Sequence, residues 1–159
     1  MTFSTNVDTT KLKFLELADH ETACEFPPGF NYRASMRRVE DLKPKLDTIL
    51  GRSLQLDKNV QDASFFTELS ILESPKNGMN IYHCVLGVRF SSFGNLFTVW
   101  SNSIVEKINE ARVAKVIAET EEAGFIYIDT ETLEQRYTGK NQYLAGNIEN
   151  WRERFFDYL

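Results

Sequence analysis

The side chains with the greatest potential for chemistry are two pairs of histidine and cysteine. His83 and Cys84 are adjacent in a stretch with strand-like alternation, and adjacent strand residues point to opposite faces of a sheet. They therefore cannot share a metal or act together as nucleophile and base. His20 and Cys24 have the spacing of one helical face, but their segment has little helical pattern and no CxxC or HExxH spacing. We interpret both pairs as structural, with Cys84 a buried apolar residue.

A second candidate site is the carboxylate-rich stretch DTETLE, which contains Asp129, Glu131 and Glu134. Hard cations prefer oxygen ligands of this kind, but the stretch lacks the glycine and the spacing of a calcium loop. The chain also contains no GxGxxG, GxxxxGK[ST] or GxSxG motif. The sequence therefore predicts no cofactor and no metal site, and it favours a protein without catalytic chemistry.

The most informative charge pattern lies between Lys115 and Arg136, an interval that contains acidic residues but no lysine or arginine. Most such runs are solvated faces. The alternative is a binding surface, because a clustered negative field attracts a basic partner such as the phosphate-binding cleft of a nuclease. The candidate partner-binding residues are Glu119, Glu121, Glu122, Asp129, Glu131 and Glu134.

Composition limits the class of protein. The 159 residues suit one domain, and an apolar content of 42% is enough to form a core rather than a disordered chain. A net charge of −5 argues against a nucleic-acid binder. The start of the chain lacks the pattern of an export signal, and the apolar runs are far shorter than the roughly 20 residues that span a bilayer. We therefore expect a cytoplasmic protein with reduced thiols and no membrane partner.

The centre of the chain predicts a three-stranded antiparallel meander. Alternating apolar and polar residues indicate strands over 65–72 and 82–90, and aromatic and β-branched residues indicate a third over 96–100. Between the first two strands, Asn77-Gly78 suits a hairpin turn, and SSFGN at 91–95 suits a second turn.

Helical spacing predicts about three helices. The first ends at Gly51 and either begins near Asp41 or is kinked at Pro44, since proline is comfortable only in the first turn. The second runs over 104–123. The third follows Asn147 as its N-cap and buries one face of the C-terminal segment.

The remaining segments complete the predicted fold. A capping box at 103–106 begins the second helix, and FIYI at 125–128 forms a short fourth strand. Residues 54–61 connect the first helix to the sheet. Residues 1–29 form a polar, irregular segment with room for one short helix or strand near 11–17. We therefore predict a single α+β domain over 1–159, with an antiparallel three- to four-stranded sheet packed against about three helices.

Three stretches carry a resemblance to known proteins: VQDASFF at 60–66, FGNLFTVW at 93–100, and WRERFFDYL at 151–159. Together they resemble small bacterial immunity proteins, which are encoded beside polymorphic or contact-dependent toxins. The resemblance implies a cytoplasmic, non-enzymatic protein that binds and neutralises a cognate toxin. Immunity proteins span many folds, so no individual binding residue can be transferred.

Two other functions stay open from the sequence. One is a small enzyme or ligand-binding domain whose pocket lies between the sheet and a covering helix, using Tyr82, His83 or Arg89. The other is a structural subunit that forms a homo-oligomer through an exposed strand edge. A polar-lined cavity would favour the first, and sedimentation behaviour would test the second.

Overall fold

The computed structural model describes residues 9–73, 83–102 and 107–159. The helices in these ranges are α1 (Thr9–Ala18), α2 (Tyr32–Leu50), α3 (Glu110–Glu122), α4 (Thr130–Leu133) and α5 (Trp151–Phe156). The strands are β1 (Gln55–Asp57), β2 (Phe65–Glu73), β3 (His83–Ser91), β4 (Leu96–Ser101) and β5 (Ile126–Tyr127). The fold is thus α+β, as predicted. The predicted turn at Asn77-Gly78 and the predicted capping box at 103–106 lie outside the described residues.

All five strands belong to one sheet with the order β1-β2-β3-β4-β5. The meander β2-β3-β4 is antiparallel as predicted, with Val88 of β3 opposite both Leu69 and Val99. The prediction of three or four antiparallel strands was wrong, because β5 pairs parallel to β4. A strand that returns to its neighbour through a crossover helix, here α3, runs parallel to it. The short edge strand β1 was missed in the segment predicted to be a connection.

The first predicted helix begins earlier than expected. Asn31 caps α2 by accepting a hydrogen bond from the backbone N–H of Ala34, and Gly51 ends it in the left-handed conformation, as predicted. Pro44 lies inside the helix. An interior proline removes one helical hydrogen bond. The helix persists because five residues along it are buried in the core: Met36, Val39, Leu42, Leu46 and Leu50.

The other helices also differ from the predicted number and boundaries. Five helices are present in the described residues rather than about three, and α1 lies where the sequence allowed one short helix or strand near 11–17. The helix α3 begins at Glu110 after the cap Asn109, and residues 107–109 are not helical. The last helix follows Asn150 rather than Asn147 and stops at Phe156, so Tyr158 and Leu159 lie beyond it and are exposed.

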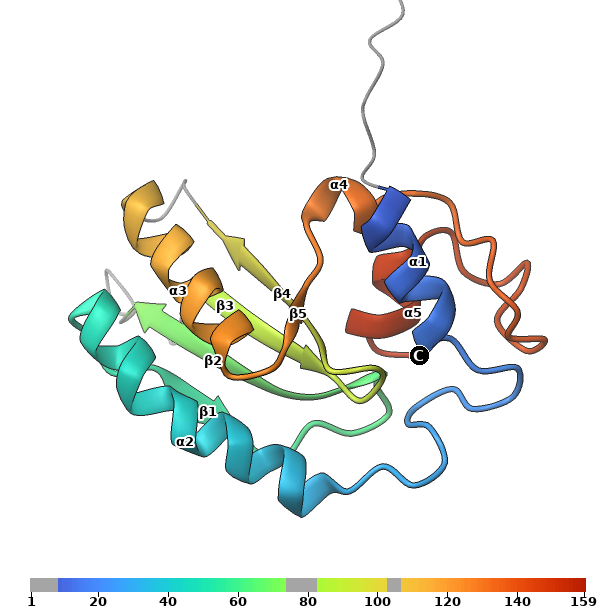
Figure 1. Ribbon diagram of the computed structural model, residues 1–159, viewed down its shortest axis with the longest axis horizontal. Coiled ribbons are helices and arrows are strands. Elements are labelled where there is room, and N and C mark those ends of the chain that lie inside the picture. The colour runs from blue at the N-terminus through green and yellow to red at the C-terminus, as the bar shows by residue number, and fades with distance from the viewer. Residues whose placement is uncertain (1–8, 74–82, 103–106) are drawn as a thin grey trace, which may run out of the picture.

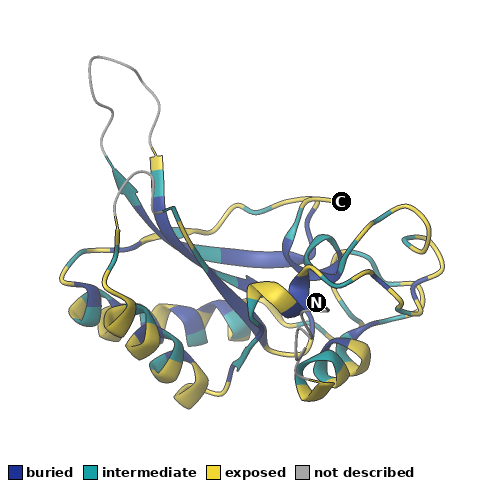
Figure 2. Cartoon of the chain, turned by 90° about the horizontal axis from the view of Figure 1, so that it is seen from above, coloured by how far each residue is buried: buried dark blue, intermediate teal, exposed yellow. Residues whose placement is uncertain are grey.

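Two apolar clusters divide the interior. In the larger one, α2 and α3 lie side by side along one face of the sheet and pack against residues such as Leu69, Val88 and Phe97 (Figure 1). In the smaller one, α1, α4 and α5 meet at the end of the sheet around Trp151 and Phe155. Figure 2 shows buried residues along both the strands and the inner sides of the helices. No helix among the described residues has the length and apolarity needed to span a membrane.

Candidate functional site

The six predicted partner-binding residues fall into two groups separated by β5. Glu119, Glu121 and Glu122 lie at the C-terminal end of α3, whereas Asp129, Glu131 and Glu134 surround α4. Three of the six have structural contacts. Glu119 lies 3.7 Å from Lys45, and Glu134 lies 3.9 Å from Arg152. Asp129 caps α4 by accepting a hydrogen bond of 3.0 Å from the Thr132 backbone N–H.

The other three residues, Glu121, Glu122 and Glu131, are exposed and form no ion pair with another described residue. Glu121 and Glu122 lie in the last turn of α3, where the helix dipole is negative and the helix has no basic residue of its own, although Arg38 of α2 donates to the Ala123 carbonyl oxygen at 3.3 Å. An acidic residue at that position is unfavourable by about 0.3–1 kcal/mol. The sequence therefore keeps negative charge at a place where it weakens the helix.

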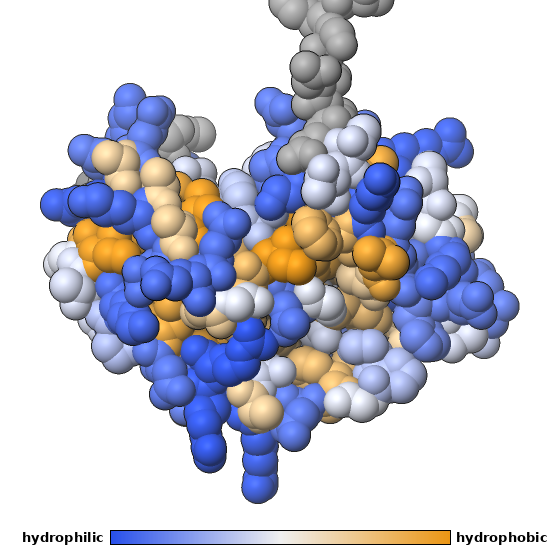
Figure 3. Space-filling view, in the orientation of Figure 1, coloured by the Kyte–Doolittle hydropathy of each residue, from blue (hydrophilic) through white to orange (hydrophobic). Residues whose placement is uncertain are grey.

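Tyr127 of β5 lies between the two acidic groups. Burial raises the pKa of Tyr127, and the negative charges of Asp129 and Glu121 raise it further. One carboxylate from each of the two acidic groups therefore raises the pKa of the same tyrosine. Lys11 lies 5.9 Å from the centre of the same ring. Figure 3 shows mainly hydrophilic side chains over α2, a mixture of hydrophilic and apolar side chains over α3, and apolar side chains near the middle of the same face.

The two His–Cys pairs have structural surroundings. His20 Nδ1 accepts hydrogen bonds from the backbone N–H groups of Thr22 and Ala23, and it therefore fixes the turn after α1. His83 is exposed and Cys84 is half-buried, with its Sγ 3.5 Å from the Leu86 carbonyl oxygen. Within the described ranges, no group of three or more histidine, cysteine or acidic side chains is placed to hold a metal.

Cys84 should react slowly with alkylating agents. Burial, with a contribution from the charge of Glu68, raises the pKa of the Cys84 thiol from 9.0 to about 11. Because the thiolate is the nucleophile, a rise of that size lowers its population at pH 8 roughly 100-fold. In a Cys24→Ser variant, we expect iodoacetamide to modify Cys84 about 100-fold more slowly than a free thiol peptide of ordinary pKa. Equal rates, measured by mass spectrometry, would contradict this environment.

Arg89 is one of the residues that the alternative of a ligand-binding domain would use, and its side chain already binds other residues of the protein. Its Nε lies 2.6 Å from Glu68 Oε2, and its Nη1 donates to the Phe156 carbonyl oxygen at 2.6 Å. The Trp100 indole N–H donates to the same Glu68 oxygen at 3.2 Å. Arg89 does line a cavity of about 300 Å³, but on the side of the sheet next to α5. Tyr82, the third residue of that hypothesis, lies outside the described residues.

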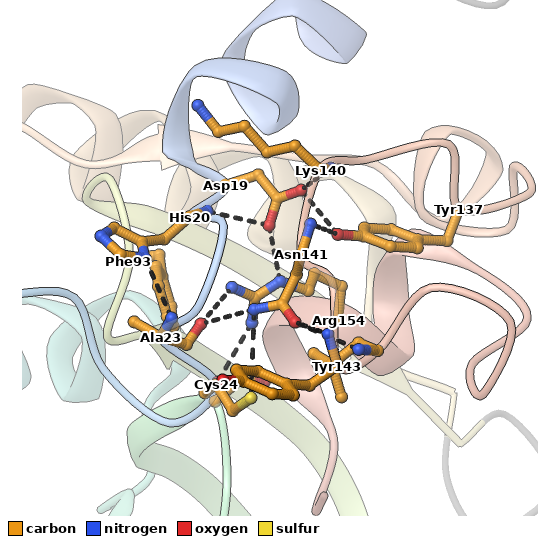
Figure 4. A network of polar contacts seen from close by, with 12 residues as sticks. Asp19, His20, Ala23, Cys24, Phe93, Tyr137, Lys140, Asn141, Tyr143 and Arg154 are labelled. Carbon is orange, nitrogen blue, oxygen red and sulfur yellow. Dashed lines mark hydrogen bonds and ion pairs between the residues drawn. The ribbon is translucent and has the colours of Figure 1, made fainter.

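A buried ion pair joins the two ends of the chain (Figure 4). The Arg154 Nε lies 2.7 Å from Asp19 Oδ1, and neither side chain is exposed to solvent. The remaining guanidinium nitrogens donate to the carbonyl oxygens of Ala23 and Cys24 at 2.8 and 3.0 Å. The guanidinium also lies over Phe93, 4.4 Å from the ring centre. A buried pair with its remaining donors satisfied is costly to break.

The same ion pair orders the loop before α5. Asp19 Oδ2 accepts hydrogen bonds from the Tyr137 hydroxyl at 2.7 Å and the Lys140 backbone N–H at 2.9 Å. Asn141, also buried, donates to the Ala23 carbonyl oxygen at 3.0 Å. At Gly139, an added Cβ would fall on Asp19 Oδ2, so only glycine fits. This network therefore holds Ala23 and Cys24 in place, directly before Glu25 and Phe26, which line a cleft on the surface.

Tyr137 should make stability fall at high pH. Burial, together with the hydrogen bond to Asp19, raises the pKa of Tyr137 from 10.0 to about 12. Because the folded protein holds this proton more tightly, the stabilisation is complete below pH 10 and is lost as the pH rises from about 10 to 12. Urea unfolding between pH 9 and 12 should show the decline. A Tyr137→Phe variant should show a shallower one, and identical pH profiles would contradict the assignment.

Several aromatic residues line a cleft of about 440 Å³ between the turn at 25–30 and the segment before β2. We call it the aromatic cleft. Phe26 is 57% exposed and Tyr32 is 41% exposed. The complete lining is Glu25, Phe26, Phe30, Tyr32, Val60, Gln61, Asp62, Ala63, Phe65, Phe66 and Ser92.

Local backbone geometry positions the rings of the aromatic cleft. Gly29 has a φ of 77°, and the Phe30 N–H donates to the Pro27 carbonyl oxygen, as in a turn that requires positive φ at its third residue. This turn brings the rings of Phe26 and Phe30 to 6.2 Å from each other. The Tyr32 hydroxyl donates to the Lys58 carbonyl oxygen at 2.7 Å and so fixes the opposite wall.

The back of the aromatic cleft is anchored in the core. Phe66 lies 5.5 Å from Phe30 and 6.5 Å from Tyr32, and on its other side 6.3 Å from Phe90 in the sheet. Next to the cleft, Tyr158 lies edge-on to Phe65 at 5.2 Å. The walls are therefore supported by packing against rigid elements rather than by loops alone.

Two acidic residues, Glu25 and Asp62, line the aromatic cleft, and each carries a carboxylate. Neither makes a hydrogen bond or ion pair with another residue that the structure describes. Asp62 has a φ of 54°, a conformation that aspartate and asparagine tolerate better than most residues. Its backbone carbonyl oxygen accepts a hydrogen bond of 2.9 Å from the Leu159 N–H. The hydrogen bond from Leu159 thus holds the backbone of Asp62 in place.

Sequence reasoning did not single out the aromatic cleft. Its residues come from 25–32, 60–66 and Ser92, and none of these segments has a catalytic motif. The available signal was local: aromatic residues on both sides of a Pro-Pro-Gly turn, in a segment with little periodicity. A cluster of that kind indicates a fixed turn with exposed rings.

Comparisons with known proteins give no family and no relative. No family model matches the chain, and neither the curated proteins nor the solved structures contain a significant match.

Proposed function

We propose that this protein is a non-enzymatic binding protein that acts in the cytoplasm as an immunity protein, binding and neutralising a cognate bacterial toxin. The observation that carries the proposal is the position of the three stretches on which the resemblance depends. Six residues of the first stretch, all of 60–66 except Ser64, line the aromatic cleft, and the second stretch begins directly after Ser92, another lining residue. The third stretch contacts the first, through Tyr158 against Phe65 and Leu159 against Asp62.

Exposed aromatic residues beside unpaired carboxylates support a protein partner. Interfaces are enriched in tyrosine and phenylalanine, and contiguous exposed apolar patches on soluble proteins mark interaction sites. Phe26, Tyr32 and Tyr158 are all exposed around this region. The acidic residues of α3 and α4 add a negative field that favours a basic partner such as a nuclease.

Pairing through a strand edge has less support. In the described part of the sheet, the edge strands β1 and β5 have three and two residues. Short edge strands offer few free backbone groups to a second chain. Sedimentation should therefore give a monomer, and a stable dimer would favour the structural alternative.

The proposed function is tested with the product of the neighbouring gene. Co-expression should restore growth of cells that produce that toxin, and the two proteins should co-purify. A catalytically inactive toxin allows the binding measurement without cell death. Failure of both protection and binding would overturn the proposal.

Charge reversal should separate the contributions of the two acidic groups. We expect Glu121→Lys/Glu122→Lys to slow association with the toxin roughly tenfold at low salt and to weaken the salt dependence, because exposed charges act mainly on encounter. Glu131→Lys should act in the same direction. Asp129 is unsuitable for reversal because it caps α4. Stopped-flow kinetics at several salt concentrations measure both effects, and unchanged rates would remove these residues from the interface.

A further inference from the structure

The lining of the aromatic cleft has an unusual charge balance. It contains two carboxylates, Glu25 and Asp62, and no lysine or arginine. Because both carboxylates lack a partner among the described residues, their charge is available to a ligand. An anionic ligand would meet two like charges, and a neutral apolar ligand would leave both carboxylates uncompensated. The complementary ligand is an elongated cation with an apolar stem.

We propose that the aromatic cleft receives an arginine side chain from a protein partner. The alkyl stem would lie against Phe26 and Phe30, and the guanidinium would meet the carboxylates of Glu25 and Asp62. A guanidinium is planar, stacks on aromatic rings and pairs with carboxylates through several N–H donors. This inference deepens the proposed function, on which it rests for the identity of the partner.

Among the described residues, three arginines stack on phenylalanine rings. Guanidinium groups lie over phenylalanine rings at 4.2 Å for Arg38 over Phe125, at 4.3 Å for Arg89 over Phe65 and at 4.4 Å for Arg154 over Phe93. The last two arginines also bind a carboxylate at 2.6 and 2.7 Å. In the aromatic cleft, Arg89 already covers Phe65, but Phe26 and Phe30 present their rings with Glu25 and Asp62 in the same lining and with no guanidinium of the described residues over them.

The chain's own N-terminal segment does not meet the charge requirement. Residues 1–8, MTFSTNVD, include no lysine or arginine. A second copy of the chain is another candidate occupant, and concentration dependence tests it directly. If amide shifts of the cleft residues changed with protein concentration before any probe was added, self-association would fill the cleft and the proposal would be overturned.

The direct test is an NMR titration with N-acetyl-arginine amide, using N-acetyl-citrulline amide as the neutral probe of the same shape. We expect the arginine probe to shift the amides of Ala63, Phe66 and Ser92 and to bind roughly tenfold more tightly than the citrulline probe. Equal binding of the two probes, or shifts elsewhere on the protein, would overturn the proposal.

Charge-matched variants assign the effect to the cleft. Glu25→Gln/Asp62→Asn removes both carboxylates, and asparagine still tolerates the positive φ of Asp62. We expect this variant to bind the arginine probe on the order of tenfold more weakly. The control Glu121→Gln/Glu122→Gln removes the same charge outside the cleft and should leave the probe affinity unchanged. Equal weakening in both variants would indicate a general charge effect and overturn the proposal.

The same variants distinguish failure of this inference from failure of the proposed function. If wild-type protein protects cells and Glu25→Gln/Asp62→Asn binds the toxin with unchanged affinity, the function stands and the arginine site is overturned. If the arginine probe binds the cleft but the wild-type protein neither protects nor binds the toxin, the site stands as one for another protein partner. If the cleft variant loses both probe binding and protection, both proposals are supported.

Discussion

Asp19→Asn should destabilise the protein by about 3–5 kcal/mol, the range for removing one partner of a buried ion pair. The substitution keeps the shape of the side chain but leaves the Arg154 guanidinium, which has no exposed area, without its counter-charge. For a chain of this length the melting temperature should fall by about 6–20 °C. Urea unfolding and thermal scans measure the loss.

A double-mutant cycle with Arg154→Met tests whether the pair is the cause. Asp19→Asn/Arg154→Met should lose less stability than the sum of the two single variants, with a coupling energy of about 0.5–3 kcal/mol. Glu16→Gln is a matched control. It also replaces a carboxylate with an amide, but Glu16 is exposed and lies on α1, the helix that directly precedes Asp19. It should change stability by less than about 0.5 kcal/mol. Additive losses in the cycle would refute the coupling.

This network also shows why the sequence predicted the centre of the fold better than its ends. The strands of the meander follow from alternation over eight or nine residues, a local signal, and Gly51 marks the end of α2 equally locally. By contrast, Asp19 and Arg154 are separated by 135 positions. Nothing in the neighbourhood of either residue indicates that its partner is a buried charge. The sequence therefore predicted an irregular start. The order of this segment depends on contacts with Arg154 near the other end of the chain, and these contacts leave no local pattern.

The missed parallel strand has a different cause. β5 has two residues, and its direction is fixed by the connection through α3 and by hydrogen bonds such as that from Ile126 to the Asn95 carbonyl oxygen. The pattern at 125–128 predicted a strand, and the structure has one over Ile126–Tyr127, but the pattern could not indicate the direction of that strand.

The candidate site was the least predictable part. Acidic residues close together in sequence looked like one surface, yet β5 divides them and Asp129 serves as a helix cap. The aromatic cleft combines three segments, and its two carboxylates, Glu25 and Asp62, are separated by 37 positions, 62 minus 25. Charge runs are visible along a chain, whereas isolated charges brought together by folding are not.

Phe90→Ala should be as damaging as Asp19→Asn, through a different mechanism. Phe90 is fully buried in the sheet, and the centres of the Phe66, Phe97 and Phe125 rings lie 6.3, 6.2 and 4.9 Å from its own. Replacing a buried phenylalanine with alanine costs about 3–5 kcal/mol, because apolar contacts are lost and a cavity remains. Urea unfolding should show a lower midpoint. Phe90→Leu, which keeps most of the volume, is the conservative control and should lose clearly less.

The two large effects should also be independent of each other. Phe90 belongs to the cluster under α2 and α3, whereas Arg154 and Asp19 pack with the cluster of α1, α4 and α5. Substitutions without shared partners add within about 0.3–0.5 kcal/mol. The loss of stability in Phe90→Leu/Asp19→Asn should therefore equal the sum of the losses in Phe90→Leu and in Asp19→Asn to within about 0.5 kcal/mol. Because Phe66 joins Phe90 to the aromatic cleft, Phe90→Ala should in addition weaken binding of the arginine probe, whereas Phe90→Leu should preserve it. Equal probe affinity in the two variants would show that the walls of the cleft do not depend on the core behind them.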